Sequence, residues 1–163
     1  MLLPLHLNLK RSAAITGTAT ANIAEADVVA GGKTIIITLT SDTWVAAGAA
    51  FDGQRQNIIN GLDSAQAEAT GWDAEVKAKE VVGAVVRTSA TVATVTLTAQ
   101  AGYNITAQET ITVTVPATAV TGAQAIIASP TFTVALVASG ILYTQMERGI
   151  RGMNRGMYTG GYR

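Results

Sequence analysis

The amino-acid sequence predicts an all-β protein folded as an antiparallel β-sandwich, and three observations support this fold class. Threonine alternates with branched aliphatic residues in several short segments, which is the period-two pattern of half-buried strands. Turn signals that contain glycine or proline separate these segments. The 163 residues include no cysteine and one histidine, and only 13% are charged. A chain of this length buries a core without disulfides, and this composition favours a structural protein over an enzyme with cofactor, metal or catalytic residues.

Residues 1–12 are predicted to form an extended N-terminal arm. Its leucines occupy alternate positions, separated by Pro4, His6 and Asn8: Leu3, Leu5, Leu7 and Leu9. One face of an extended segment with this pattern is apolar and seeks a partner surface. Two basic residues follow the apolar run, whereas a secretory signal has its basic residues first. We expect the arm to bind protein; its apolar run is also too short to span a membrane.

Residues 13–138 are predicted to form the sandwich, with strong strands at 33–40, 91–98, 109–115 and 131–137. Weaker strands are expected at 14–22 and 84–89. In each strong strand the aliphatic side chains face the core and the threonines face solvent. The expected core residues are Ile35, Ile37, Leu39, Ala93, Val95, Leu97, Ile111, Val113, Val115, Phe132, Val134 and Leu136.

A helical insertion is predicted at about residues 49–80. From 49 to 69 the apolar period becomes helical, with one stripe formed by Phe51, Ile58, Leu62 and Ala65. Trp72 ends or kinks this helix, and a further short turn is expected at 74–81. We expect the two aromatic residues to lie in the core; the alternative is that the insertion contacts a neighbouring subunit. The acidic residues here lack calcium-loop spacing and are expected on a solvated face: Asp52, Asp63, Glu68, Asp73 and Glu75.

Residues 139–163 are predicted to form a C-terminal arm rich in arginine and glycine. Its charged residues are Glu147 and four arginines, a net charge of +3 that offsets −3 in residues 1–140. We interpret the arm as a protein-binding segment, in which arginines pair with carboxylates and the larger side chains fill pockets. Contact with nucleic acid and a tail without a partner are the alternatives. The candidate contact residues are Tyr143, Met146, Arg148, Arg151, Met153, Arg155, Met157, Tyr158, Tyr162 and Arg163.

Three parts of the chain resemble a known protein class: GGKTIIITLTSDTWV at 31–45, FDGQRQNIINGL at 51–62, and ETITVTVP at 109–116 with SPTFTV at 129–134. They are similar to the small immunoglobulin-like virion proteins and domains of tailed bacteriophages, in which a helical segment interrupts the strands. The resemblance covers roughly residues 14–137.

This resemblance implies an immunoglobulin-like antiparallel β-sandwich with an inserted helical segment, to which the two arms are added. It also implies a virion structural protein without a cofactor, placed as capsid decoration, in the head–tail connector region, or at a tail or fibre attachment. The implied partners are other virion proteins and copies of the chain itself, in a symmetric particle assembled in the host bacterial cytoplasm. The alternative function is a secreted or cell-surface module for adhesion or carbohydrate binding.

Overall fold

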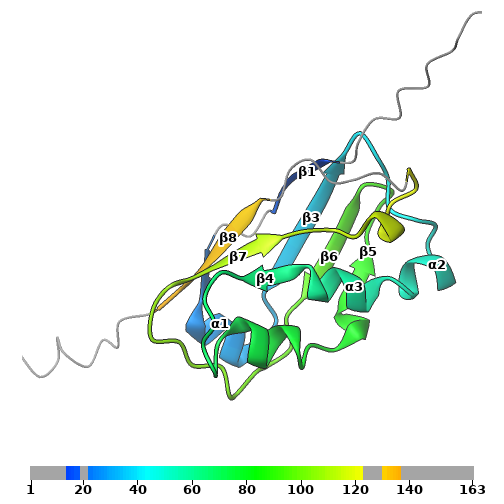
Figure 1. The fold of residues 1–163 in the computed structure, drawn as a ribbon. Coiled ribbons are helices and arrows are strands. Elements are labelled where there is room, and N and C mark those ends of the chain that lie inside the picture. The colour runs from blue at the N-terminus through cyan, green and yellow to red at the C-terminus, as the bar shows by residue number, and fades with distance from the viewer. Residues whose placement is uncertain (1–13, 19–21, 123–129, 137–163) are drawn as a thin grey trace, which may run out of the picture.

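The structure is a computed structural model that describes residues 14–18, 22–122 and 130–136, and in these residues two four-stranded sheets form a β-sandwich (Figure 1). One sheet has the strand order β1-β3-β6-β5 and the other the order β2-β8-β7-β4. The strands are β1 (Ala14–Thr18), β2 (Asn22–Ala24), β3 (Thr34–Thr40), β4 (Leu62–Ser64), β5 (Val85–Arg87), β6 (Val92–Thr96), β7 (Glu109–Val113) and β8 (Thr131–Ala135). The predicted β-sandwich is confirmed at this level.

The core lies between the two sheets and is built by the alternation that the sequence displays. Ile35 pairs with Val95 and Ile111 pairs with Phe132, so aliphatic and aromatic side chains stack across neighbouring strands. The expected core residues are all buried except Leu136, which is 44% exposed. Leu136 is the exception because β8 ends at Ala135, one residue before it.

The segment predicted as one weak strand at 14–22 is two strands in different sheets. β1 pairs with β3 in the antiparallel sense, with an irregularity between Ile15 and Gly17. β2 pairs with β8 and runs parallel to it, so the sandwich is not antiparallel throughout. The chain therefore crosses from one sheet to the other within residues 14–24, and this early strand contributes to both layers.

A short helix that the sequence pattern did not reveal, α1 (Glu25–Ala30), follows β2 directly. Asp27 Oδ2 accepts a 2.9 Å hydrogen bond from the Ala24 N–H, which holds the pKa of this carboxyl below its ordinary value. The helix ends at Gly31, whose φ is +73° and where a Cβ atom would lie 2.6 Å from the backbone nitrogen of Ala99. Only glycine fits this conformation and this close approach.

The long helix predicted at 49–69 is wrong in its second half. The chain forms α2 (Ala49–Asp52) and α3 (Arg55–Asn60) and then enters β4. Leu62 is buried as a strand residue, and Ala65 is exposed. The change occurs at Gly61, because its carbonyl accepts the Thr114 N–H at 2.8 Å and the chain joins the sheet beside β7.

Three further short turns complete the connections. They are the π-helix η1 (Asp73–Lys77) and the 3₁₀ turns η2 (Val82–Ala84) and η3 (Ala117–Ala119). Phe51 and Trp72 are buried, as predicted. Their rings make edge-on contacts with Trp44 and Phe132 at centroid distances of 5.8 and 5.5 Å. The helix α3 packs against β4, β5 and η2, and so closes one side of the sandwich (Figure 1).

Candidate functional site

The residues predicted to mediate assembly lie outside the described part of the chain. This applies to every candidate in the N-terminal arm, from Leu3 to Leu9, and in the C-terminal arm, from Tyr143 to Arg163. Their role stays a prediction.

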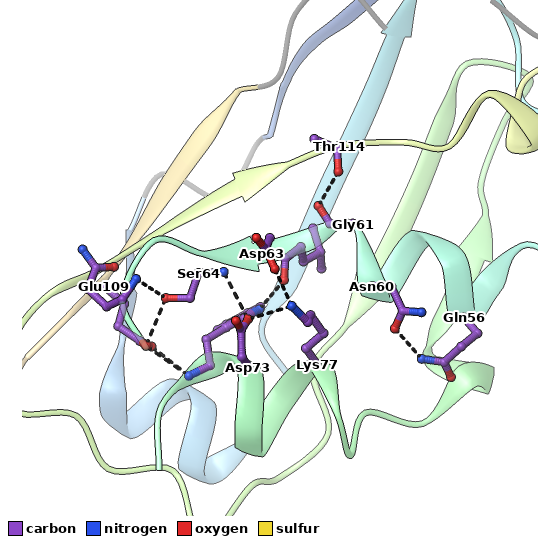
Figure 2. A network of polar contacts seen from close by, with 12 residues as sticks. Gln56, Asn60, Gly61, Asp63, Ser64, Asp73, Lys77, Glu109 and Thr114 are labelled. Carbon is purple, nitrogen blue, oxygen red and sulfur yellow. Dashed lines mark hydrogen bonds and ion pairs between the residues drawn. The ribbon is translucent and has the colours of Figure 1, made fainter. Parts of the chain in front are cut away.

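A buried carboxylate lies at the start of β7. The Glu109 side chain is fully buried and accepts hydrogen bonds from three residues. Figure 2 shows it beside Ser64. The Trp72 N–H reaches both carboxylate oxygens, at 3.1 and 3.0 Å. The Ser64 hydroxyl donates to Oε1 at 3.2 Å and the Tyr103 hydroxyl to Oε2 at 2.6 Å. Glu109 therefore joins β4, β7 and the loop before β7 at one end of the sandwich.

The absence of a side chain at Gly71 makes this arrangement possible. A Cβ atom on Gly71 would lie 2.5 Å from Glu109 Oε1 and 2.9 Å from the Cβ of Glu68. The missing side chain thus lets the Trp72 N–H approach the carboxylate. Burial, together with the hydrogen bond to Glu109, raises the pKa of Tyr103 above its ordinary value. Tyr103 accordingly stays a proton donor in the folded protein.

The sequence analysis missed Glu109, although the signal was present. Glu109 shares its parity with Ile111 and Val113, so the period-two pattern already directs it inward. A charged side chain on the inward face of a strand needs internal donors. The four hydrogen-bond contacts from Trp72, Ser64 and Tyr103 supply these donors. They also hold the segments that carry these three residues in place.

Other carboxylates hold the same end of the molecule by accepting backbone hydrogen bonds. Glu80 accepts from the N–H and hydroxyl of Thr98, and Glu68 accepts from the N–H and hydroxyl of Thr106. Lys77 pairs with Asp63 and Asp73, and the bond to Asp63 raises the pKa of the lysine above its ordinary value (Figure 2).

The solvated acidic face predicted for the insertion is therefore only partly correct. Glu75 is buried and pairs with Lys79 at 2.5 Å, and Asp73 Oδ1 accepts the Ser64 N–H at 3.1 Å. Asp73 differs from the prediction because irregular backbone near a core needs acceptors, and Glu75 differs because it pairs with Lys79. In the described residues, no group of three or more acidic or histidine side chains has the arrangement of a metal site.

The edge of β4 is covered by the segment that follows it. Gly61 and Ala65 bond to residues of β7 and its continuation, so the backbone groups of Leu62 and Ser64 point away from that strand. Trp72 Nε1 donates to the Leu62 carbonyl at 2.9 Å, and Asp73 accepts the Ser64 N–H. These side chains occupy the positions that a further strand would need.

The edge of β5, at the far side of the other sheet, is open. The Thr88 N–H donates to the Val92 carbonyl at 2.9 Å, and Val86 lies opposite Thr94, so the backbone groups of Val85 and Arg87 point away from β6. The Val85 N–H is used by the η2 turn. The Val85 carbonyl and the N–H and carbonyl of Arg87 have no hydrogen-bond partner within residues 14–18, 22–122 and 130–136.

The outward surface beside this edge is uncharged and combines threonines with branched aliphatic side chains. Val81, Val82 and Val86 are 55%, 39% and 51% exposed. The outward positions of β3, β6 and β5 carry only threonine, valine and isoleucine: Thr34, Ile36, Thr38, Thr40, Val86, Val92, Thr94 and Thr96. Depletion of charged residues is typical of the centres of protein interfaces.

The charges of the chain are divided between its middle and its ends. Residues 14–136 carry ten acidic and five basic side chains, a net charge of −5. Residues 1–13 carry two basic side chains, and residues 137–163 carry four basic and one acidic side chain. Of the five basic residues in the described part, four form ion pairs there and Arg87 on β5 forms none. The ends are thus complementary in charge to the sandwich.

Comparison of the chain with protein-family profiles, with curated proteins and with solved structures finds no match. None of the helices in the described residues is long and apolar enough to cross a membrane. Functional inference therefore depends on the sequence resemblance, the strand order and the surfaces described above.

Proposed function

We propose that the chain is a structural protein of a bacteriophage virion that assembles through its sandwich surface and its two terminal arms. Its position would be that of a capsid decoration protein, a component of the head–tail connector region, or a tail or fibre attachment. Its partners would be other virion proteins and further copies of the chain, in a particle assembled in the host bacterial cytoplasm. Catalysis has no part in this proposal.

The observation that carries the proposal is the strand order. If the strands are named A to G in chain order, with β1 and β2 as two halves of A, the sheets read A-B-E-D and C-F-G, with β2 added beside G. The A-B-E-D and C-F-G groupings agree with those expected of an immunoglobulin-type sandwich, which supports this part of the proposal. Helices interrupt the B–C connection, where α2 and α3 lie between β3 and β4. The order supports the fold that the sequence resemblance implies.

The surface properties support assembly as the role. An uncharged outward sheet face, an open strand edge and ends of opposite charge to the sandwich are features of a protein that binds neighbours. The described polar clusters are satisfied internally and brace loops. Their geometry favours a scaffold over a reaction centre.

The experiment that tests the proposal is to ask whether purified phage particles contain the chain. Particles from a lysate of the encoding host would be separated on a density gradient and examined by mass spectrometry and antibody labelling. We expect the chain in the particles at a fixed multiple of another structural protein. Its absence from particles, with labelling of the bacterial surface or the culture medium, would instead support the adhesion module.

A further inference from the structure

We infer that the open edge of β5 accepts the leucine segment 2–9 of a second copy of the chain as an added strand. This inference rests on the proposed assembly role and deepens it, because it names the partner, the acceptor edge and the direction of the added strand. A strand added to a sheet edge gains affinity from backbone hydrogen bonds and specificity from alternate side chains.

The acceptor is defined by three unpaired backbone groups in the described structure. They are the carbonyl of Val85 and the N–H and carbonyl of Arg87. The contrast with β4 is informative, because there Trp72 binds the Leu62 carbonyl and Asp73 binds the Ser64 N–H, which are two of the three equivalent groups. Natural proteins usually cover or charge their sheet edges. β5 is short and ends in Arg87, but its central residue, Val86, is an exposed valine.

Pro4 determines how the leucine segment can pair. Proline has no N–H, so it must occupy a position that points away from β5. The backbone groups of alternate residues, such as His6, then also point away from β5. The backbone groups of the leucines point toward β5 and form the hydrogen bonds. In a parallel pair, the residue opposite Arg87 is one that points away, such as His6. The leucine side chains then lie on the face of Val86.

Antiparallel pairing would give the opposite result. In an antiparallel pair, the residue directly opposite Arg87 would have to form backbone hydrogen bonds with it, and that residue would be a leucine. The leucine side chain would then project on the inner face, as Arg87 does. On that side α3 already closes the sandwich. The exposed apolar side chain at this edge, Val86, is on the outward face. Parallel addition therefore places the leucine side chains on the same face as the exposed Val86, and it is the direction that we infer.

The length of the chain favours a segment from another copy. β1 and β5 lie at opposite edges of one sheet, so a strand beyond β5 is four strand spacings from β1, about 19 Å. When the whole segment is seated, with Leu7 beside Val86 and Leu9 at the end of β5, the chain from Leu9 to Ala14 spans at most about 17 Å and cannot reach the β5 of its own copy. In this seating each copy gives one segment and accepts one. Contacts of this head-to-tail kind generate closed rings or filaments.

Cysteine cross-linking tests the pairing directly, because the natural chain contains no cysteine. Full-length chains would carry Val86→Cys together with Leu3→Cys, Leu5→Cys or Leu7→Cys, since the segment can seat in steps of two residues. We expect at least one of these pairs to give a ladder of covalent multimers under oxidation, which a reductant collapses. The matched controls, Val86→Cys with His6→Cys or Asn8→Cys, project on the other face and should stay monomeric.

Mixing the single variants separates the possible sources of the segment. A chain with only Val86→Cys and a chain with only the reactive leucine replacement should form a mixed disulfide dimer. Cross-linking confined within single chains would overturn the inference. So would cross-linking of only the His6 or Asn8 controls, which indicates antiparallel addition, or no cross-linking at all.

A second measurement does not require an introduced disulfide. Val86→Lys should raise the concentration at which copies associate by roughly tenfold in analytical ultracentrifugation, because a charge would enter the contact. Val29→Lys replaces another exposed valine, on α1, and should leave association unchanged. Equal association of Val86→Lys and the natural chain would overturn the inference.

The two proposals fail in different ways. Cross-linking of the purified chain, with no chain in phage particles, would refute the virion role and support the β5 contact. Incorporation into particles without cross-linking would support the virion role and refute the β5 contact.

Discussion

The Tyr103 hydroxyl donates a 2.6 Å hydrogen bond to Oε2 of Glu109, and both side chains are buried. This bond links the loop before β7 to the first residue of β7. The N–H of Trp72 and the hydroxyl of Ser64 reach the same carboxylate from the insertion and from β4. One acidic side chain thus fixes three segments that are distant in sequence.

Replacing Glu109 by alanine should lower the free energy of unfolding by about 2–4 kcal/mol, because buried donors would lose their acceptor. Urea denaturation followed by circular dichroism measures this change. Glu68→Ala is the control, because its partner Thr106 is exposed, and it should cost less than about 1 kcal/mol. Equal losses in the two variants would contradict a special role for the buried carboxylate.

Tyr103 should make the protein sensitive to alkali. Its pKa in the folded state lies above the ordinary value of 10.0, so above that pH the unfolded chain loses a proton that the folded chain keeps. Stability is therefore fully present below pH 10 and falls as the pH rises further, by up to about 1.4 kcal/mol per pH unit. Denaturation of the natural chain and of Tyr103→Phe between pH 9 and 11 checks this; the variant should show a smaller slope.

Gly71→Ala should destabilise the protein by about 1–3 kcal/mol, since the added methyl group would overlap Glu109 Oε1 and displace the Trp72 N–H. The matched control is Gly83→Ala, where a Cβ atom has no neighbour nearer than 3.9 Å. Thermal unfolding of the two variants should differ clearly. A Gly71 variant as stable as the control would show that the close approach is not needed.

Core truncations test the sandwich itself. Val113→Ala or Phe132→Ala should cost about 2–5 kcal/mol, because each leaves a cavity between the sheets. Leu136→Ala, at an exposed position after β8, should cost less than about 1 kcal/mol. The ranking would be reversed if β8 presented its other face to the core.

Deletion of residues 141–163 tests the C-terminal arm. We expect a folded, soluble protein with unchanged far-ultraviolet circular dichroism that is not incorporated into particles. Salt bridges alone, at about 0–1 kcal/mol each, could not hold such an arm, so its apolar side chains must contribute. Normal incorporation of the truncated chain would contradict the arm hypothesis, and salt-sensitive binding of the arm to DNA would support the nucleic-acid alternative.

The strands were predictable where the local pattern is long. β3, β6, β7 and β8 each show the threonine–aliphatic alternation, and its parity even directs Glu109 inward. β2 and β4 have only three residues, so their identity depends on pairing with β8 and β7. The helix predicted through Leu62 failed for this reason, because a sheet partner outweighed the local helical period.

The open edge could not be found from the sequence alone. It depends on the order of strands in the sheet and on which neighbour covers which edge, and neither is a local property. Val85–Arg87 resembles any short apolar strand in sequence. Only the comparison with β4, where Trp72 supplies a cover, distinguishes the two edges.

The parallel pair β2–β8 has a mechanical consequence. Once β1 has separated from β3, a pull on the two ends of the chain reaches β2 at its N-terminal end and β8 at its C-terminal end, and these ends lie at opposite extremities of the pair. The backbone bonds between the two strands are then loaded together in shear, and they must break at once instead of one after another. A sandwich held by both of its ends would thereby resist tension along the direction in which it is stretched.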